Sequence, residues 1–165
     1  MYQFNGGQAM NKEKQLLMNF NDVYNKIVML NKPKMEESLK GHKPSEVHCI
    51  ESIGKSGSAN VTQLAESLYM TRGAISKLTK KLLEKGLIES YQKLDNKKEI
   101  YFRLTESGKE IFTIHEELHN EFRERDKVVF EQLTETQFDS MLGFLETYSR
   151  HLDEEIKKQD VPHHH

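Results

Sequence analysis

The chain has 165 residues, of which 36% are hydrophobic and 30% charged, and its formal net charge is -2. That length and composition suit one compact domain, or two small lobes that share helices. The single cysteine, Cys49, excludes an internal disulfide, so a reducing cytoplasm is the simple interpretation. No apolar run approaches the ~18 residues of a membrane-spanning helix, and the N-terminus lacks the apolar core of a signal peptide. We therefore expect no membrane association.

The charge is unevenly distributed along the chain. Residues 71–103 hold nine Lys or Arg against four Asp or Glu, whereas residues 104–160 hold seven against fifteen. A basic block in an acidic chain indicates either a face that binds a polyanion or a solvated basic helix.

Apolar spacing predicts two helices in the first third of the chain. Residues at intervals of 4-3-4-3 form one helical stripe, which consists of Leu16, Phe20, Val23, Ile27 and Leu30. This helix should end near Lys32-Pro33, because a residue before proline avoids helical geometry. The next helix has Pro44 in its first turn and should end near Gly54 or Gly57. Its apolar positions are Val47, Ile50 and Ile53.

Two more helices follow, separated by a short turn. Asn60 and Gln63 have the spacing of a capping box and open a short helix through Leu68. Thr71 is then a new N-cap, and Gly86 ends the second helix. That helix buries Ile75, Leu78 and Leu82 and leaves its polar and basic residues outside.

After Gly86 the apolar period changes from about 3.6 to 2, which predicts a β-hairpin. One strand covers residues 87–93, the other carries Ile100, Phe102 and Leu104 on one face, and L-D-N-K-K-E forms the polar tip. A long helix follows from Thr105, and the capping box Thr134–Gln137 opens a last helix. Its apolar stripe resembles a coiled-coil seam and consists of Phe138, Met141, Leu145, Tyr148 and Leu152.

These elements predict a mainly α fold with a small β-hairpin wing, in which a winged helix-turn-helix lobe joins a helical lobe. We expect an N-terminal helix and connection at 12–42, the winged lobe at 43–105, and a connector helix with the C-terminal helix at 106–160. Residues 161–165 look like the remnant of a purification tag.

A helix after such a turn fits the major groove of B-DNA, and its first residues reach base edges. A hairpin tip suits the minor groove or its phosphate rims. The candidate DNA-binding residues are Thr71, Arg72, Gly73, Ser76, Lys77, Lys80, Lys93, Asn96, Lys97 and Lys98. A winged-helix module that binds protein is the alternative.

This arrangement resembles the MarR family of bacterial transcription regulators. The segments that carry the resemblance are N-V-T-Q-L-A-E-S-L, T-R-G-A-I-S-K-L-T-K-K-L-L-E-K-G-L-I and D-N-K-K-E-I-Y-F-R-L-T-E-S-G-K. The resemblance implies a homodimeric regulator, expected to be a repressor, that binds a pseudo-palindromic operator under the control of an effector. The family's wing tip often carries D-x-R, whereas this chain has Asp95-Asn96-Lys97-Lys98, which favours phosphate anchoring over minor-groove reading.

The implied homodimer pairs the N- and C-terminal helices of both subunits, as their two apolar stripes already suggest. The candidate dimerisation residues are Leu16, Phe20, Val23, Ile27, Phe138, Met141, Leu145, Tyr148 and Leu152.

His115, Glu116 and His119 spell H-E-x-x-H, the helical zinc motif of many metalloproteases. A small zinc hydrolase is therefore a rival hypothesis to the regulator. It would also need a third protein ligand, an open coordination position and a substrate cleft. We expect no enzyme, because the motif lies on the connector helix.

The zinc-sensing branch of the MarR family uses two histidines at this spacing. The resemblance adds His48 and, as the fourth ligand, Glu37, for which Glu36, His42 or Cys49 could substitute. Three histidines and a carboxylate suit zinc or another divalent transition metal. In the alternative interpretation these histidines line a pocket for a small-molecule effector or simply pack at the junction.

Overall fold

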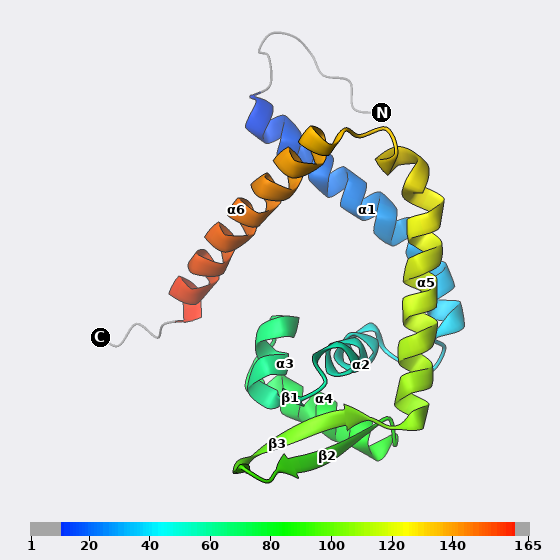
Figure 1. Cartoon of the computed structure of the whole chain (residues 1–165), viewed down its shortest axis with the longest axis vertical. Helices are drawn as coiled ribbons and strands as arrows, with labels where there is room; N and C mark the ends of the chain where they lie inside the picture. The colour runs from blue at the N-terminus through cyan, green and yellow to red at the C-terminus, as the bar shows by residue number, and fades with distance from the viewer. Residues whose placement is uncertain (1–10, 161–165) are drawn as a thin grey trace. The chain divides into compact units, whose positions relative to one another are not determined.

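A computed structural model of the chain describes residues 11–160, so the expected tag remnant at 161–165 lies outside the described residues. The structure divides into two compact units, one that ends at Asn120 and one that begins at Glu121 (Figure 1). The secondary structure elements are, in order, α1 (Lys12–Ser38), α2 (Pro44–Ser56), β1 (Ala59–Asn60), α3 (Val61–Leu68), α4 (Arg72–Glu84), β2 (Ile88–Lys93), β3 (Asn96–Leu104), α5 (Glu106–Phe130) and α6 (Glu135–Asp160). The prediction of a mainly α fold with a β-hairpin wing is confirmed.

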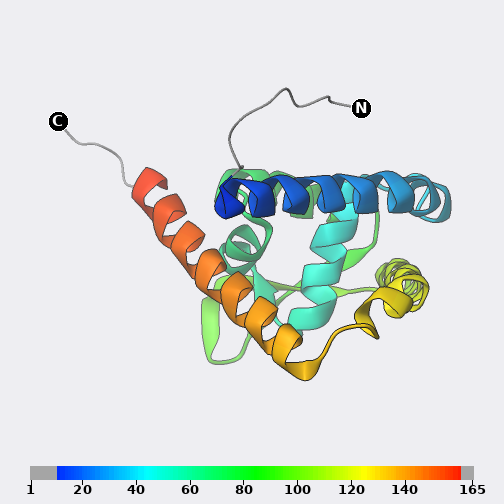
Figure 2. The ribbon, with the colours of Figure 1, turned by 90° about the horizontal axis from the view of Figure 1, so that it is seen from above.

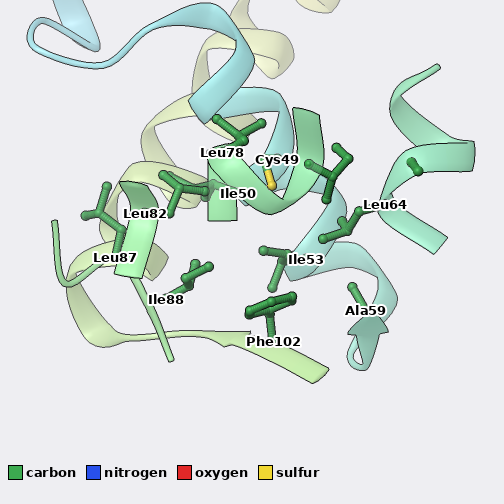
Figure 3. Packing of buried hydrophobic residues seen from close by; sticks show 12 residues of the cluster. Cys49, Ile50, Ile53, Ala59, Leu64, Leu78, Leu82, Leu87, Ile88 and Phe102 are labelled. Atoms are coloured by element: carbon green, nitrogen blue, oxygen red, sulfur yellow. The ribbon is translucent and has the colours of Figure 1, made fainter. Parts of the chain in front are cut away.

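Helices α2, α3 and α4 pack with a three-stranded antiparallel sheet of order β1-β3-β2. Phe102 of β3 pairs with Ala59 on one side and with Ser90 on the other. Figure 3 shows the core between these helices and the sheet, where Ile50, Ile53 and Leu82 lie close to Phe102 and Ile88. Burial of one such aliphatic side chain contributes roughly 1.5–3 kcal/mol to folding, so the core holds the helix-turn-helix together.

The helix caps predicted from the sequence are present in the structure. Asn60 accepts from the Gln63 backbone N–H at 2.9 Å, while the Gln63 side chain accepts from the Asn60 backbone at 3.1 Å. The Thr71 hydroxyl accepts from the Ala74 backbone N–H and begins α4. Gly57 and Gly86 follow their helices with left-handed φ values of 68°. These caps satisfy backbone groups that a helix end leaves without partners.

Two details of the predicted elements were wrong, and one short strand was not predicted. Helix α1 continues through Pro33 to Ser38 (Figure 2), because a proline removes one backbone hydrogen bond without forcing a helix to end. The polar tip is reduced to a turn at Leu94-Asp95, since the strands pair as far as Lys93 and Asn96. Strand β1 is too short to have a periodicity of its own and forms only because β3 pairs with it.

The second unit contains the end of α5 and helix α6. The predicted capping box forms, because Thr134 and Gln137 exchange side-chain hydrogen bonds with each other's backbone N–H. Phe130 and Phe138 stack across the turn with ring centroids 6.4 Å apart. No helix in residues 11–160 is both long and apolar enough to cross a membrane.

Cys49 is fully buried in the core, and its burial raises the pKa of the thiol to about 12. A thiol in this state is neutral at physiological pH and poorly nucleophilic. The residue therefore serves packing.

Glu46 of α2 is a fully buried carboxylate that ties α2 to α4. Its two oxygens lie 2.8 Å from the ammonium groups of Lys81 and Lys85, and one of them also accepts from the Lys43 backbone N–H. Burial alone would raise the pKa of Glu46, but the hydrogen bonds from the two lysines outweigh it and lower that pKa to about 2. The ionised form is therefore the one that stabilises the fold.

Replacing Glu46 with glutamine should lower the free energy of unfolding at pH 7 by up to about 3 kcal/mol, the equivalent of the pKa shift. The native pKa lies below the unfolded value of 4.5, so this stability is present above pH 4.5 and is lost as the pH falls toward 2. Urea unfolding at pH 7, 4.5 and 3.5 should show the gap between wild type and Glu46→Gln closing. Glu84→Gln, at an exposed position at the end of α4, is the control, and a gap independent of pH would contradict the assignment.

Candidate DNA-binding surface and histidine cluster

Helix α4 presents one polar face to solvent, because Ile75, Leu78 and Leu82 bury the other face in the core. Thr71, Arg72, Gly73, Ser76, Lys77 and Lys80, the predicted contact residues of this helix, are all exposed. Arg72, Lys77 and Lys80 form no ion pair within residues 11–160. Their charge is therefore available to an external anion.

Other basic side chains of residues 71–103 form ion pairs within the protein. Lys81, which the helical pattern places outside, is half-buried and pairs with Glu46, as Lys85 does. Arg103 pairs with Glu89 at 2.6 Å and lies over the Tyr91 ring. The positive charge offered to a ligand is thus concentrated on the exposed face of α4 and at the wing.

The four predicted contact residues of the wing fall into two groups with different surroundings. The Lys93 ammonium donates to the Ser58 hydroxyl at 3.3 Å and lies 4.2 Å from the centre of the Tyr101 ring. The Asn96 side chain contacts the Tyr101 hydroxyl and accepts from the Lys98 backbone N–H. Lys93 and Asn96 therefore shape the wing, while the side chains of Lys97 and Lys98 are exposed.

The histidines of H-E-x-x-H lie on α5, in the same unit as α2. The ring of His115 is buried, with 2% of its surface exposed, and its Nε2 lies 3.1 Å from Nε2 of His119. His48, exposed on α2, has its ring centre 6.3 Å from that of His115. The structure therefore brings the three predicted histidines together. Burial lowers the pKa of His115 and outweighs the nearby Glu51 carboxylate, which raises it, while His119 and His48 lower it further; the net shift favours the neutral imidazole that a metal requires.

The spacing of the two Nε2 atoms fits a metal ion. The two rings share a hydrogen bond between their Nε2 atoms at 3.1 Å. Two nitrogens at the usual zinc distance of about 2.0–2.1 Å in tetrahedral geometry lie about 3.3 Å apart, so a metal ion could replace the shared proton with little movement. The donor set is chemically suitable for zinc, but His48 would have to turn toward the pair to join it.

The carboxylate beside these histidines is Glu51, which the sequence interpretation missed. Glu51 Oε2 lies 3.8 Å from Nδ1 of His115, and Glu51, His115 and Glu116 can each offer a ligand atom within 4.8 Å of the others. Glu37 is exposed near the end of α1 and does not belong to this group. Glu51 lies three residues after His48, one helical turn along α2, and this spacing was the available signal.

The proposed substitutes for Glu37 also have other surroundings. Glu36 pairs with Lys32 at 3.6 Å, His42 lies 3.9 Å from the Glu46 carboxylate, and Cys49 is in the core. Beside the histidines is a surface hollow of about 710 Å³, lined in part by His48, Glu51, Lys55, Ser67 and His119. This hollow could admit a metal ion or a small molecule.

Comparison with known proteins identifies the winged lobe. Residues 43–100 match the family model described as MarR family. An uncharacterized HTH-type transcriptional regulator of Bacillus subtilis, YhjH, is 36% identical over 91 residues, which cover 55% of this chain and 52% of YhjH. PchR, an HTH-type transcriptional regulator of the same organism, is 28% identical over 148 residues, which cover 81% of this chain and 88% of PchR. The chain thus spans about half the length of YhjH and most of PchR.

Among solved structures, Streptococcus pneumoniae FabT in complex with DNA superposes with a TM-score of 0.72 and 20% identity over 86% of this chain and 98% of FabT. At that identity the likeness establishes the fold. The curated relatives are named as transcription regulators and not as enzymes, which confirms the expectation that this chain is not an enzyme.

Gly73 lies at the start of the exposed face of α4, and a Cβ atom built on it meets nothing within 4 Å. Gly73→Ala should therefore raise the free energy of unfolding by about 0.5–1 kcal/mol through helix propensity. The added methyl group should weaken DNA binding about tenfold, equivalent to about 1.4 kcal/mol, if the backbone approaches DNA here. Thermal unfolding and fluorescence anisotropy with labelled DNA measure the two effects.

Gly143→Ala is the matched control, because Gly143 of α6 is equally open. It should give the gain in stability without the loss of affinity. A Gly73→Ala protein that binds DNA as tightly as wild type would contradict close approach at this position.

Proposed function

Because residues 43–100 of this chain belong to the MarR family, we propose that the protein is a transcription regulator, a repressor, that binds double-stranded operator DNA. Helix α4 acts as the recognition helix in the major groove, and the wing contacts the neighbouring phosphates. The observation that carries this proposal is the exposed polar face of α4, whose cations have no internal ion pair in the described part of the chain. FabT, the structural neighbour with the same fold, was solved with DNA.

The proposed contacts differ in what they contribute. Arg72, at the first turn of α4, is placed to form a bidentate contact with a base edge. Lys77, Lys80, Lys97 and Lys98 are point charges suited to phosphates. Lys93 and Asn96 contribute indirectly, by holding the shape of the wing.

The protein is proposed to bind as a homodimer, each subunit occupying half of a pseudo-palindromic operator. Helix α1 buries none of its residues within the chain, and Leu16, Phe20, Val23 and Ile27 are all exposed. Helix α6 likewise exposes Met141, Leu145 and Leu152, with Phe138 and Tyr148 half-buried. Apolar stripes of this size on polar helices are typical of surfaces that a partner covers. A second copy provides matching stripes by symmetry.

A divalent transition metal, with zinc as the best candidate, is the proposed effector. His115 and His119 would hold it through Nε2, and His48 would complete a set of three imidazoles. When bound, the metal would cross-link α2 and α5. A small molecule in the adjacent hollow is the second candidate effector, supported by the volume of about 710 Å³.

Glu116 of H-E-x-x-H would be the general base of a hydrolase. Its carboxylate lies 3.4 Å from the ammonium of Lys55. That carboxylate is engaged by an ammonium group, so we propose that the motif provides ligands in this protein and no catalytic base.

Electrophoretic mobility shift with the promoter region of the protein's own gene tests the DNA-binding function. Wild type should shift the fragment as a complex of two chains, and the affinity should fall steeply with salt because phosphate contacts release counterions. Combined replacement of Lys77 and Lys80 by alanine should weaken binding to all sequences and reduce the salt slope by about two. Arg72→Ala should instead relax sequence preference, at a cost of about 1–3 kcal/mol on the operator.

Lys109→Ala, at an exposed lysine that pairs with Glu106, is the control for the loss of a surface charge. Absence of a shifted band at low salt on any genomic fragment would remove the proposal.

Zinc titration against a chromophoric chelator tests the effector. His163–His165 should be replaced by alanine in every protein of the series, because a terminal histidine run binds metals itself. His115→Ala should lower zinc affinity by at least about 100-fold, or 2.7 kcal/mol, while His151→Ala, at an exposed histidine of α6, should leave it unchanged. Equal zinc affinity in wild type and in the combined His48, His115 and His119 alanine variant would eliminate the metal.

A further inference from the structure

The two ring nitrogens of His115 have different neighbours. Nε2 lies 3.1 Å from Nε2 of His119, on the side of the proposed metal. Nδ1 is buried and makes no hydrogen bond within residues 11–160, although Glu51 Oε2 is only 3.8 Å away. A buried polar nitrogen without a hydrogen-bond partner destabilises the fold. Glu51 is the nearby acceptor that Nδ1 of His115 could use.

Lys55 holds Glu51 in this position. The Lys55 ammonium donates a short hydrogen bond to Glu51 Oε1, one helical turn earlier on α2. It also pairs with Glu116 of α5. Oε1 of Glu51 is therefore engaged by Lys55, while Oε2 is directed to His115.

We infer that Glu51 is a positioning residue that accepts a hydrogen bond from Nδ1–H of His115 and so keeps the Nε2 lone pair available to the metal. Metal-binding histidines commonly donate their second ring N–H to a carboxylate, which fixes the tautomer and the ring orientation. A shift of about 1 Å brings Glu51 Oε2 into hydrogen-bonding range of Nδ1. The inference rests on the proposed metal site and assigns a role to a residue outside the set of three histidines.

The alternative is that Glu51, Nδ1 of His115 and Glu116 bind a cation themselves, since they can offer three ligand atoms within 4.8 Å of one another. The ammonium of Lys55 opposes this arrangement, because it already bridges the two carboxylates. A metal there would have to displace a cation that both carboxylates hold. A metal at Nε2 would leave the Lys55 contacts intact, and this difference favours Glu51 as a hydrogen-bond acceptor over Glu51 as a ligand.

The two arrangements predict different effects of removing the carboxylates. In the chain with His163–His165 replaced by alanine, Glu51→Ala should lower zinc affinity about 10- to 100-fold, the usual cost of losing such a partner. Glu51→Gln, which retains an oxygen acceptor, should recover most of this loss. Glu116→Ala should change zinc affinity less than threefold, and so should Glu117→Ala at an exposed neighbouring position. Equal losses in Glu51→Ala and Glu116→Ala would overturn the inference in favour of direct coordination.

The tautomer of His115 supplies a measurement that needs no metal. Long-range ¹H–¹⁵N correlation spectra of the metal-free protein at neutral pH should show the proton on Nδ1 in wild type and in Glu51→Gln. In Glu51→Ala the proton should be distributed between Nδ1 and Nε2. An unchanged tautomer in Glu51→Ala, with its fold verified by circular dichroism, would refute the positioning role.

These spectra also distinguish a failure of the role inferred for Glu51 from a failure of the proposed metal effector. If wild type binds no zinc, the metal proposal fails while the tautomer still decides whether Glu51 orients His115. If zinc binds at the three histidines but Glu51→Ala neither changes the tautomer nor weakens binding, only the inference fails.

Discussion

The ion pairs of the buried Glu46 carboxylate determine where helix α4 can lie. Glu46 has no contact with solvent, so its charge must be matched by Lys81 of α4 and by Lys85, the C-cap of that helix. A shift of α4 along its axis would separate these groups and leave a buried charge without partners, which is strongly destabilising. The register of the exposed face of α4 thus depends on a residue of α2.

The same stretch of α2 also carries the histidine site. His48 and Glu51 are three residues apart and share one face of α2, whereas Glu46, two residues before His48, points to another face. Glu46 faces α4, whereas Glu51 and His48 lie toward α5. Any ligand that fixed His48 and Glu51 against α5 would act on the helix that holds α4. The proposed effector site and the proposed DNA-binding face are therefore connected through α2 and the ion pairs of Glu46.

The parts of the fold that depend on neighbouring residues were predictable from the sequence. Thr71 caps α4 and Asn60 caps α3 through contacts three residues apart, and such contacts leave a sequence signature. Strand β1 and the continuation of α1 past Pro33 depend on pairing and on helix continuity, which no local pattern records. Tertiary context decided these elements.

The same distinction applies to the candidate site. The exposure of Arg72, Lys77 and Lys80 follows from helical periodicity and the burial of Ile75, so the contact face of α4 was predictable. The sequence could not show that Lys93 contacts Tyr101 and Ser58, because their positions depend on how the strands pair. Counting basic residues gives the net charge of a segment. It does not show how many of those basic side chains remain unpaired, because some of them pair with carboxylates or aromatic rings inside the protein.

The motif H-E-x-x-H shows how surroundings decide the chemistry of a sequence pattern. In this chain Lys55 neutralises the carboxylate of Glu116, and His115 has imidazoles on one side and carboxylates on the other. A hydrolase would need Glu116 free to take a proton from a metal-bound water, and here that carboxylate and Glu51 share a single ammonium. Helical spacing alone places two histidines one turn apart, but it does not determine what faces the residue between them. In this chain the ammonium of Lys55, on the neighbouring helix, lies beside that residue, and the role proposed for this stretch of α5 is to supply ligands.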